Sequence, residues 1–84
     1  MSKDGGGWSV TVMAFGQLAE RLGGRTHHHM VPAGSTVRTV VEHLALHEWI
    51  DFGLSVALNG NRCSLDTPVH DGAELALLPP VSGG

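Results

Sequence analysis

The sequence predicts an α+β fold in which one main helix packs on one face of a mixed β-sheet. Three observations lead to this prediction. Five segments have the alternating or β-branched pattern of strands, two have apolar residues at helical spacing, and turns rich in glycine and proline separate them. A chain of 84 residues has room for one domain only.

The first third of the chain predicts a strand, a short helix and a second strand. Residues 1–7 are polar and glycine-rich, so we expect a flexible leader there. The first strand is expected over 8–15, and both of its faces become apolar toward its end, as in a central strand. Apolar side chains at helical spacing over 15–22 predict the short helix, which ends at the glycines 23–24. The second strand is expected over 25–31.

The middle of the chain predicts the main helix. Ser35 or Thr36 caps its start. Its apolar stripe consists of Val37, Val40, Val41, Leu44 and Ala45. We expect the helix to fray over 47–50, and Trp49, Ile50 and Phe52 to cover one end of the core.

The last third predicts three strands. Apolar residues alternate over 54–58, and Asn59-Gly60 is typical of a type I′ hairpin turn. A short strand through Cys63 and a last strand over 74–78 follow. Because the first and last strands are apolar on both faces, we expect them to lie side by side and parallel in the middle of the sheet. The helix stripe should then pack on Val10, Val12, Val56, Leu58, Leu75 and Leu77.

Charge and composition argue against several kinds of partner. The net charge is −3, with only five Lys plus Arg, so no cationic stripe is available for a nucleic acid. No apolar run approaches the roughly 20 residues that span a bilayer, and residues 1–7 lack the apolar core of a signal peptide. Cys63 is the one cysteine and has no internal disulfide partner, which predicts a reducing, cytoplasmic location.

Few side chains form a pattern typical of catalysis or metal binding. His43 and His47 are four residues apart, a spacing that suits zinc on a helix, but the sequence assigns no third ligand. We therefore interpret them as surface histidines and expect no metal site. Cys63 and His70 lack the oxyanion site that a nucleophilic pair needs, so a structural thiol is the preferred interpretation.

The C-terminal segment is the most distinctive part of the sequence. Two prolines end the last strand and stiffen an extended exit, and two glycines could pass through a channel too narrow for any Cβ. By itself this segment is equally compatible with an ordinary frayed end. The predicted tail consists of Pro79, Pro80, Val81, Ser82, Gly83 and Gly84.

Five motifs together resemble the ubiquitin-like β-grasp sulfur carriers, and within them the small-subunit branch of molybdopterin synthase. These motifs are Ala14-Phe15-Gly16, Leu18 to Gly23, Val56 to Gly60, Asp71 to Leu75, and the terminal Pro79 to Gly84. The resemblance covers the chain from Val10 on. It departs from the family at Ala73, where an acidic residue is usual, and in the extra glycine leader.

The resemblance implies a β-grasp domain over 8–78 with a tail over 79–84. It implies a non-catalytic carrier whose Gly84 carboxylate is activated with ATP by an adenylyltransferase related to ubiquitin-activating enzymes. A sulfurtransferase or cysteine-desulfurase relay would then convert Gly84 to a thiocarboxylate. The tail would donate this sulfur inside the large subunit of molybdopterin synthase, and the carrier itself would hold no stable cofactor.

The apolar residues of the predicted strands also suggest where partners dock. We expect five apolar residues to lie together beside the tail, on the sheet face away from the main helix: Met13, Phe15, Ala57, Ala76 and Leu78. A contiguous apolar surface of this kind is typical of a binding site. The alternative is that the short helix or the loop around Pro68 covers it.

Three other functions remain compatible with the sequence. The chain could carry sulfur for another pathway, such as thiamine or cysteine synthesis. It could be a ubiquitin-like modifier that is attached to lysines through Gly84, because that role needs the same activation. It could also be a plain binding module or a metal binder with an unused tail.

Overall fold

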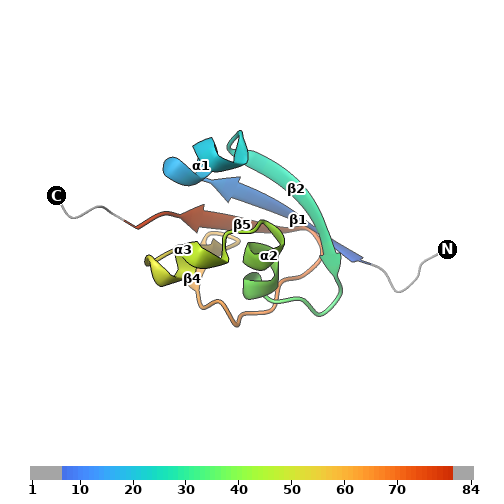
Figure 1. Cartoon of the computed structure of the whole chain (residues 1–84). Coiled ribbons are helices and arrows are strands. Elements are labelled where there is room, and N and C mark those ends of the chain that lie inside the picture. Colours follow the sequence, from blue (N-terminus) through green and yellow to red (C-terminus); the bar gives the residue numbers. More distant parts are fainter. Residues whose placement is uncertain (1–6, 81–84) are drawn as a thin grey trace.

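The computed structural model describes residues 7–80, which form a five-stranded mixed sheet with three helices (Figure 1). The elements are β1 (Gly7–Ala14), α1 (Gln17–Leu22), β2 (Thr26–Pro32), α2 (Val37–His43), α3 (His47–Asp51), β3 (Ser55–Leu58), β4 (Asn61–Cys63) and β5 (Ala73–Leu78). The strand order is β2-β1-β5-β3-β4. The predicted α+β architecture is confirmed.

The centre of the sheet is the predicted parallel pair. β1 and β5 run parallel, with Val12 beside Leu75. β2 pairs antiparallel with β1, and β3 pairs antiparallel with both β5 and β4. The β3–β4 hairpin turns at Asn59 and Gly60, whose φ values of 51° and 86° are those that a type I′ turn requires. This topology is the β-grasp arrangement.

β1 begins one residue earlier than predicted. Gly7, which we assigned to the leader, pairs with Pro32 at the start of the β1–β2 ladder. The rest of the leader, 1–6, and the end of the tail, 81–84, lie outside the described residues. The expectations for those two segments therefore remain predictions.

The main helix is interrupted, which the sequence did not predict. α2 ends at His43, and Ala45 takes a left-handed conformation with φ of 59° before α3 starts at His47. The turn directs Leu46 into the core, where it is fully buried, while Ala45 itself is exposed. Assigning Ala45 to the apolar stripe was therefore wrong, because the backbone turns at that residue.

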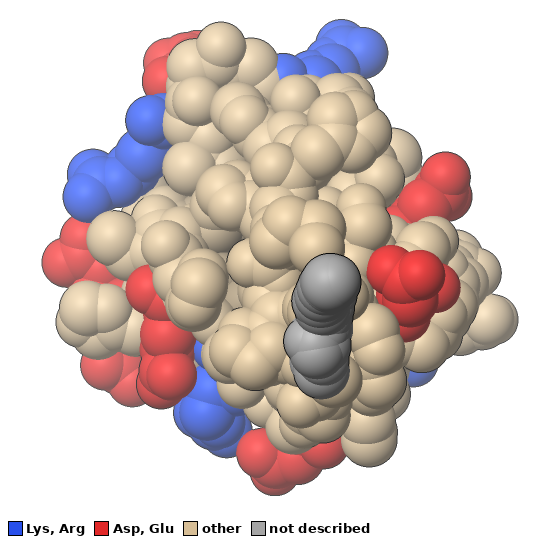
Figure 2. Space-filling model, turned by 90° about the vertical axis from the view of Figure 1, so that its right-hand side faces the viewer, with Lys and Arg blue, Asp and Glu red and all other residues tan. Residues whose placement is uncertain are grey.

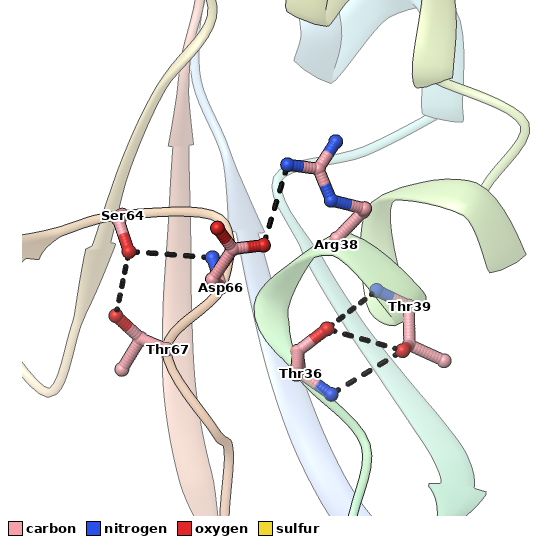
Figure 3. Close-up of polar contacts among 6 residues, drawn as sticks. All are labelled: Thr36, Arg38, Thr39, Ser64, Asp66 and Thr67. Carbon is pink, nitrogen blue, oxygen red and sulfur yellow. Dashed lines mark hydrogen bonds and ion pairs between the residues drawn. The ribbon is translucent and has the colours of Figure 1, made fainter.

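The start of α2 is capped by Thr36, one of the two predicted residues. The Thr39 amide donates to Thr36 Oγ1 at 3.4 Å, and the Thr36 amide donates to Thr39 Oγ1 at 3.3 Å, forming a capping box (Figure 3). The loop after β4 adds support from outside the helix. The Val37 amide donates to the Thr67 carbonyl, and Arg38 pairs with Asp66 at 3.4 Å (Figure 3).

Removing the Thr36 hydroxyl should destabilise the fold by about 1 kcal/mol, the usual cost of losing a helix cap. For a domain of this size, that loss lowers Tm by about 4–8 °C. We expect this result for Thr36→Ala in urea and thermal unfolding followed by circular dichroism. Thr36→Ser keeps the hydroxyl and is the control, so a Tm as low as that of the alanine variant would contradict the role of the cap.

The core lies between α2 and one face of the sheet. Val37, Val40 and Val41 of α2 are fully buried in one cluster with residues of β1, β3 and β5. The sheet residues of this cluster include Val10, Val12, Val56, Leu75 and Leu77, while Leu44 and Leu58 are partly buried against it. The predicted packing of the helix stripe is confirmed for these residues.

The end of the core differs from the prediction in one residue. Trp49 and Ile50 pack against the core cluster as expected. Phe52 is 60% exposed and contacts Trp49 edge-on, with ring centroids 5.8 Å apart. Its assignment to the core was wrong, because α3 ends at Asp51 and the chain has already turned outward at Phe52.

Candidate functional site

The tail leaves the domain at the end of β5, over two glycines from distant parts of the chain. Pro79 and Pro80 follow β5 and are half-buried. A Cβ added to Gly16 would lie 3.3 Å from Pro79 Cγ, and one added to Gly53 would lie 3.5 Å from Pro80 Cβ. The two proline rings thus rest against backbone that carries no side chain.

Both glycines are in loops that meet the sheet where β5 ends. Gly16 lies between β1 and α1, with φ of 56°, and Gly53 lies between α3 and β3, with φ of 101°. The sequence pattern identified Gly16 only as a strand breaker and did not link either glycine to the tail. The available signal was the repeated Phe-Gly dipeptide, at Phe15-Gly16 and Phe52-Gly53.

The remaining predicted tail residues cannot be compared with the structure. Val81, Ser82, Gly83 and Gly84 lie outside the described residues. Their assigned roles remain predictions.

The strand register brings three of the five predicted docking residues into one row of the sheet. The register places Met13 beside Ala76 and Ala76 beside Ala57, in one row across β1, β5 and β3. Leu78 is the last residue of β5, and Phe15 directly follows the last residue of β1. None of the five belongs to the core cluster; Phe15 is 39% exposed, whereas Ala57 is buried, at 9%. We call this set, Met13, Phe15, Ala57, Ala76 and Leu78, the apolar patch.

The two segments that could cover the apolar patch both contribute side chains to the core. Leu18 of α1 is buried in the core cluster, with Leu22 packed against that cluster. Pro68 bridges to Thr36 at the start of α2, and the next residue, Val69, also joins the core. Both segments therefore have at least one side chain on the helix side of the sheet.

Polar side chains border the apolar patch. Toward the amino-terminal end of β1, Thr11 pairs with Glu74, and its Oγ1 lies 3.2 Å from His28 Nδ1. At the β4 edge, Arg62 lies beside Ala57 and donates to Ser55 Oγ at 3.2 Å. An apolar centre with a polar margin is the usual composition of a protein-binding surface.

His43 and His47, the two histidines at zinc spacing, do not lie on one continuous helix. His43 is the last residue of α2 and His47 the first of α3, so the turn at Ala45 separates them. Among residues 7–80, no group of three or more His, Cys, Asp or Glu side chains could hold a metal ion. His27 and His29 of β2 are neighbours, with ring centroids 6.5 Å apart.

The surroundings of His29 predict that stability depends on pH. Partial burial, together with the nearby His27 and His43, lowers the pKa of His29 below its ordinary value of 6.5. The folded state therefore binds this proton less readily than the unfolded chain, and the free energy of unfolding should fall as pH drops below 6.5.

Urea titrations between pH 7.5 and pH 5 test this dependence. We expect His29→Asn to reduce the loss of stability on acidification relative to wild type, because the variant has no proton to gain at that position. Equal losses in the two proteins would show that His29 does not contribute.

Cys63 and His70 have separate surroundings. Cys63 is half-buried against the core cluster. His70 Nδ1 donates to the Asp71 carbonyl at 3.0 Å, and His70 Nε2 accepts from Asn59 Nδ2 at 2.7 Å. Because both ring nitrogens are engaged, the geometry favours structural roles for these two residues.

Charged side chains are dispersed. On the face shown in Figure 2, Lys and Arg side chains lie apart around the margin, and Asp and Glu lie between them. None of the helices within residues 7–80 is long and apolar enough to cross a membrane.

A β-grasp sheet whose last strand ends in a Pro-Pro exit is the architecture of ubiquitin-like carriers and modifiers. The sequence pattern of the ThiS family matches residues 12–84. This match covers most of the chain, so the protein belongs to the ThiS family of ubiquitin-like sulfur carriers.

Three relatives agree with this membership. The chain is 35% identical over 82 residues to the molybdopterin synthase sulfur carrier subunit of Escherichia coli K12, covering 89% of this chain and 99% of that protein. It is 31% identical to the small archaeal modifier protein 1 of Haloferax volcanii, with a TM-score of 0.77, covering 89% and 100% of the two chains.

The third relative comes from a solved complex. A chain in the complex of subunits 1 and 2 of the Helicobacter pylori molybdopterin-converting factor is 28% identical, with a TM-score of 0.60 and coverage of 90% and 99%.

Proposed function

We propose that this sulfur carrier serves molybdopterin synthesis, with the Gly84 carboxylate as the group that accepts and delivers sulfur. The observation that carries the proposal is the position of the tail exit, because Pro79 and Pro80 leave the sheet directly beside the apolar patch. A partner that binds the patch is therefore placed to receive the tail. The identity to the Escherichia coli sulfur carrier subunit supports the choice of pathway.

The chemistry has two steps at Gly84. The carboxylate attacks the α-phosphorus of ATP in an activating adenylyltransferase, pyrophosphate leaves, and an acyl-adenylate forms. A sulfide equivalent from a sulfurtransferase or cysteine-desulfurase relay then attacks the acyl carbon. The new C–S bond replaces the C–O bond to AMP, AMP leaves, and a thiocarboxylate remains.

The domain supplies binding and reach in this reaction, and its partners supply catalysis. The tail over 79–84 spans about 20 Å when extended, so Gly84 can enter a partner's active site while the domain stays outside. The geometry around Cys63 and His70 favours structural roles, which fits a carrier that relies on its partners. No bound cofactor is required, since ATP belongs to the adenylyltransferase, and the reduced thiols of the relay fit the cytoplasm.

We propose that two partners use the apolar patch in turn. One is the adenylyltransferase and the other is the large subunit of molybdopterin synthase, because both must hold the same tail. The Helicobacter pylori complex shows that a relative of this chain pairs with the second subunit of its converting factor. Competition between the two partners for this chain is the expected consequence.

Intact-mass spectrometry tests the proposed function. The protein is incubated with an activating adenylyltransferase, ATP and sulfide, and we expect exchange of one carboxylate oxygen for sulfur. Thiocarboxylate protein should then convert a pterin precursor only when the large subunit is added. No exchange would contradict the carrier role, and exchange without pterin conversion would favour thiamine or cysteine synthesis.

The likeness to a small archaeal modifier protein favours one second candidate, a protein modifier. That role would use the same adenylate but transfer Gly84 to a lysine amine. A ladder of heavier conjugates in cells that express a tagged chain would support it. The absence of conjugates, together with thiocarboxylate formation, supports the carrier.

A further inference from the structure

We propose that Gly16 and Gly53 are positioning residues whose bare α-carbons seat Pro79 and Pro80 and so set the direction in which the tail leaves the domain. The inference rests on the proposed function, since it concerns how the tail is presented to the activating enzyme.

The evidence for these two glycine–proline contacts is that Gly16 and Gly53 differ from the other glycines with positive φ. Six described glycines have positive φ, and a Cβ added to Gly23, Gly34, Gly60 or Gly72 would meet nothing within 4 Å. Only Gly16 and Gly53 of these six have neighbours, and in both cases the neighbour is a proline of the tail. Turn geometry alone accounts for the other four glycines but not for these contacts.

The two glycine–proline contacts differ in how little space they leave for a Cβ. At Gly16 an added Cβ would lie 3.3 Å from Pro79 Cγ, so the proline ring would have to shift by a few tenths of an ångström. At Gly53 the distance to Pro80 Cβ is 3.5 Å, an ordinary contact that a methyl group would only just fill. Substitution at Gly16 should therefore disturb the tail more than substitution at Gly53.

Seating the prolines reduces the cost of binding. A tail that leaves in one direction has already lost part of the backbone freedom that a partner would otherwise have to remove. Once the tail is bound to the enzyme, the Gly84 carboxylate reacts in the same surroundings, whether or not Pro79 and Pro80 contacted the glycines in the free protein. Losing one of these glycine–proline contacts should therefore raise KM and leave kcat unchanged.

The experiment measures pyrophosphate release by the activating adenylyltransferase with full-length variants as substrates. We expect Gly16→Ala to raise KM about tenfold, the effect of freeing about one backbone residue, with kcat unchanged. Gly34→Ala is the matched control, because it has the same sign of φ at 91° but no neighbour for the new methyl group. Its KM should stay within about twofold of wild type.

A double variant separates the contact from general backbone strain. Pro79→Ala removes the Cγ that a Cβ at position 16 would meet, so Gly16→Ala should have little further effect in that background. We expect each single variant and the double variant all to show about a tenfold higher KM. A hundredfold rise in the double variant, or equal effects of Gly16→Ala and Gly34→Ala, would overturn the proposal.

A second measurement does not depend on activity. In wild-type protein we expect a nuclear Overhauser effect between Gly16 Hα and the Pro79 ring, and another between Gly53 Hα and the Pro80 ring. If these nuclear Overhauser effects are absent, the proposed contacts of Gly16 and Gly53 with the tail prolines are refuted, even if sulfur transfer succeeds. Their presence in a protein that forms no thiocarboxylate would instead refute the proposed function.

Discussion

Deleting Gly84 should abolish thiocarboxylate formation while leaving the domain folded. Removing one residue shortens the reach of the tail by about 3.5 Å, and a misplacement of about 1 Å already costs about a hundredfold in rate. The fold should not change, because the core cluster of the described residues ends at Leu77. Intact-mass spectrometry measures the sulfur, and thermal unfolding measures the fold.

Two further variants complete this test. One extra residue after Gly84 moves the carboxylate away from the chain end and should also abolish transfer. Cys63→Ser keeps the tail and should transfer sulfur at nearly the wild-type rate. An inactive Cys63 variant together with an active Gly84 deletion would show that the thiol, not the carboxylate, carries the sulfur.

Replacing Phe15 by serine should weaken binding of both the adenylyltransferase and the large subunit. Phe15 is the aromatic residue of the apolar patch, it is 39% exposed, and it lies beside the tail exit. Aromatic anchors at the centre of an interface commonly contribute about 2 kcal/mol or more, which is about thirtyfold in Kd. Titration calorimetry of each partner with the folded variant measures the change.

Met30→Ser is the matched control for this substitution. Met30 is 62% exposed and pairs with Ser9, at the end of the sheet away from the tail. It removes a comparable apolar side chain outside the proposed interface, so both affinities should stay near wild type. If a folded Phe15→Ser variant binds both partners as tightly as wild type does, the docking surface lies elsewhere.

Local patterns were sufficient to predict most of the secondary structure. The cap at Thr36 and the turn at Asn59-Gly60 are each decided by residues a few positions apart. The valines of α2 also repeat at the period of a helix, so their buried face was predictable.

The break after α2 was not predictable in the same way. Leu44 and Ala45 continue the helical pattern, so nothing local marks a turn there. A left-handed alanine costs roughly 1–2 kcal/mol, and burying a leucine contributes roughly 1.5–3 kcal/mol. The burial of Leu46 therefore offsets the strain at Ala45, and only the shape of the surrounding core decides that balance.

The sequence by itself determined the order of strands and helices and the Pro-Pro-Val-Ser-Gly-Gly ending, because these follow from periodicity and from residues adjacent in the chain. The β-grasp arrangement was implied by the family resemblance, and the parallel pairing of β1 with β5 joins residues far apart in sequence. Only the tertiary structure decided that Gly16 and Gly53 meet the tail and that Phe52 is exposed. Those features depend on contacts between residues far apart in sequence. Such contacts are set by how the whole sheet and its loops pack, and no local pattern encodes them.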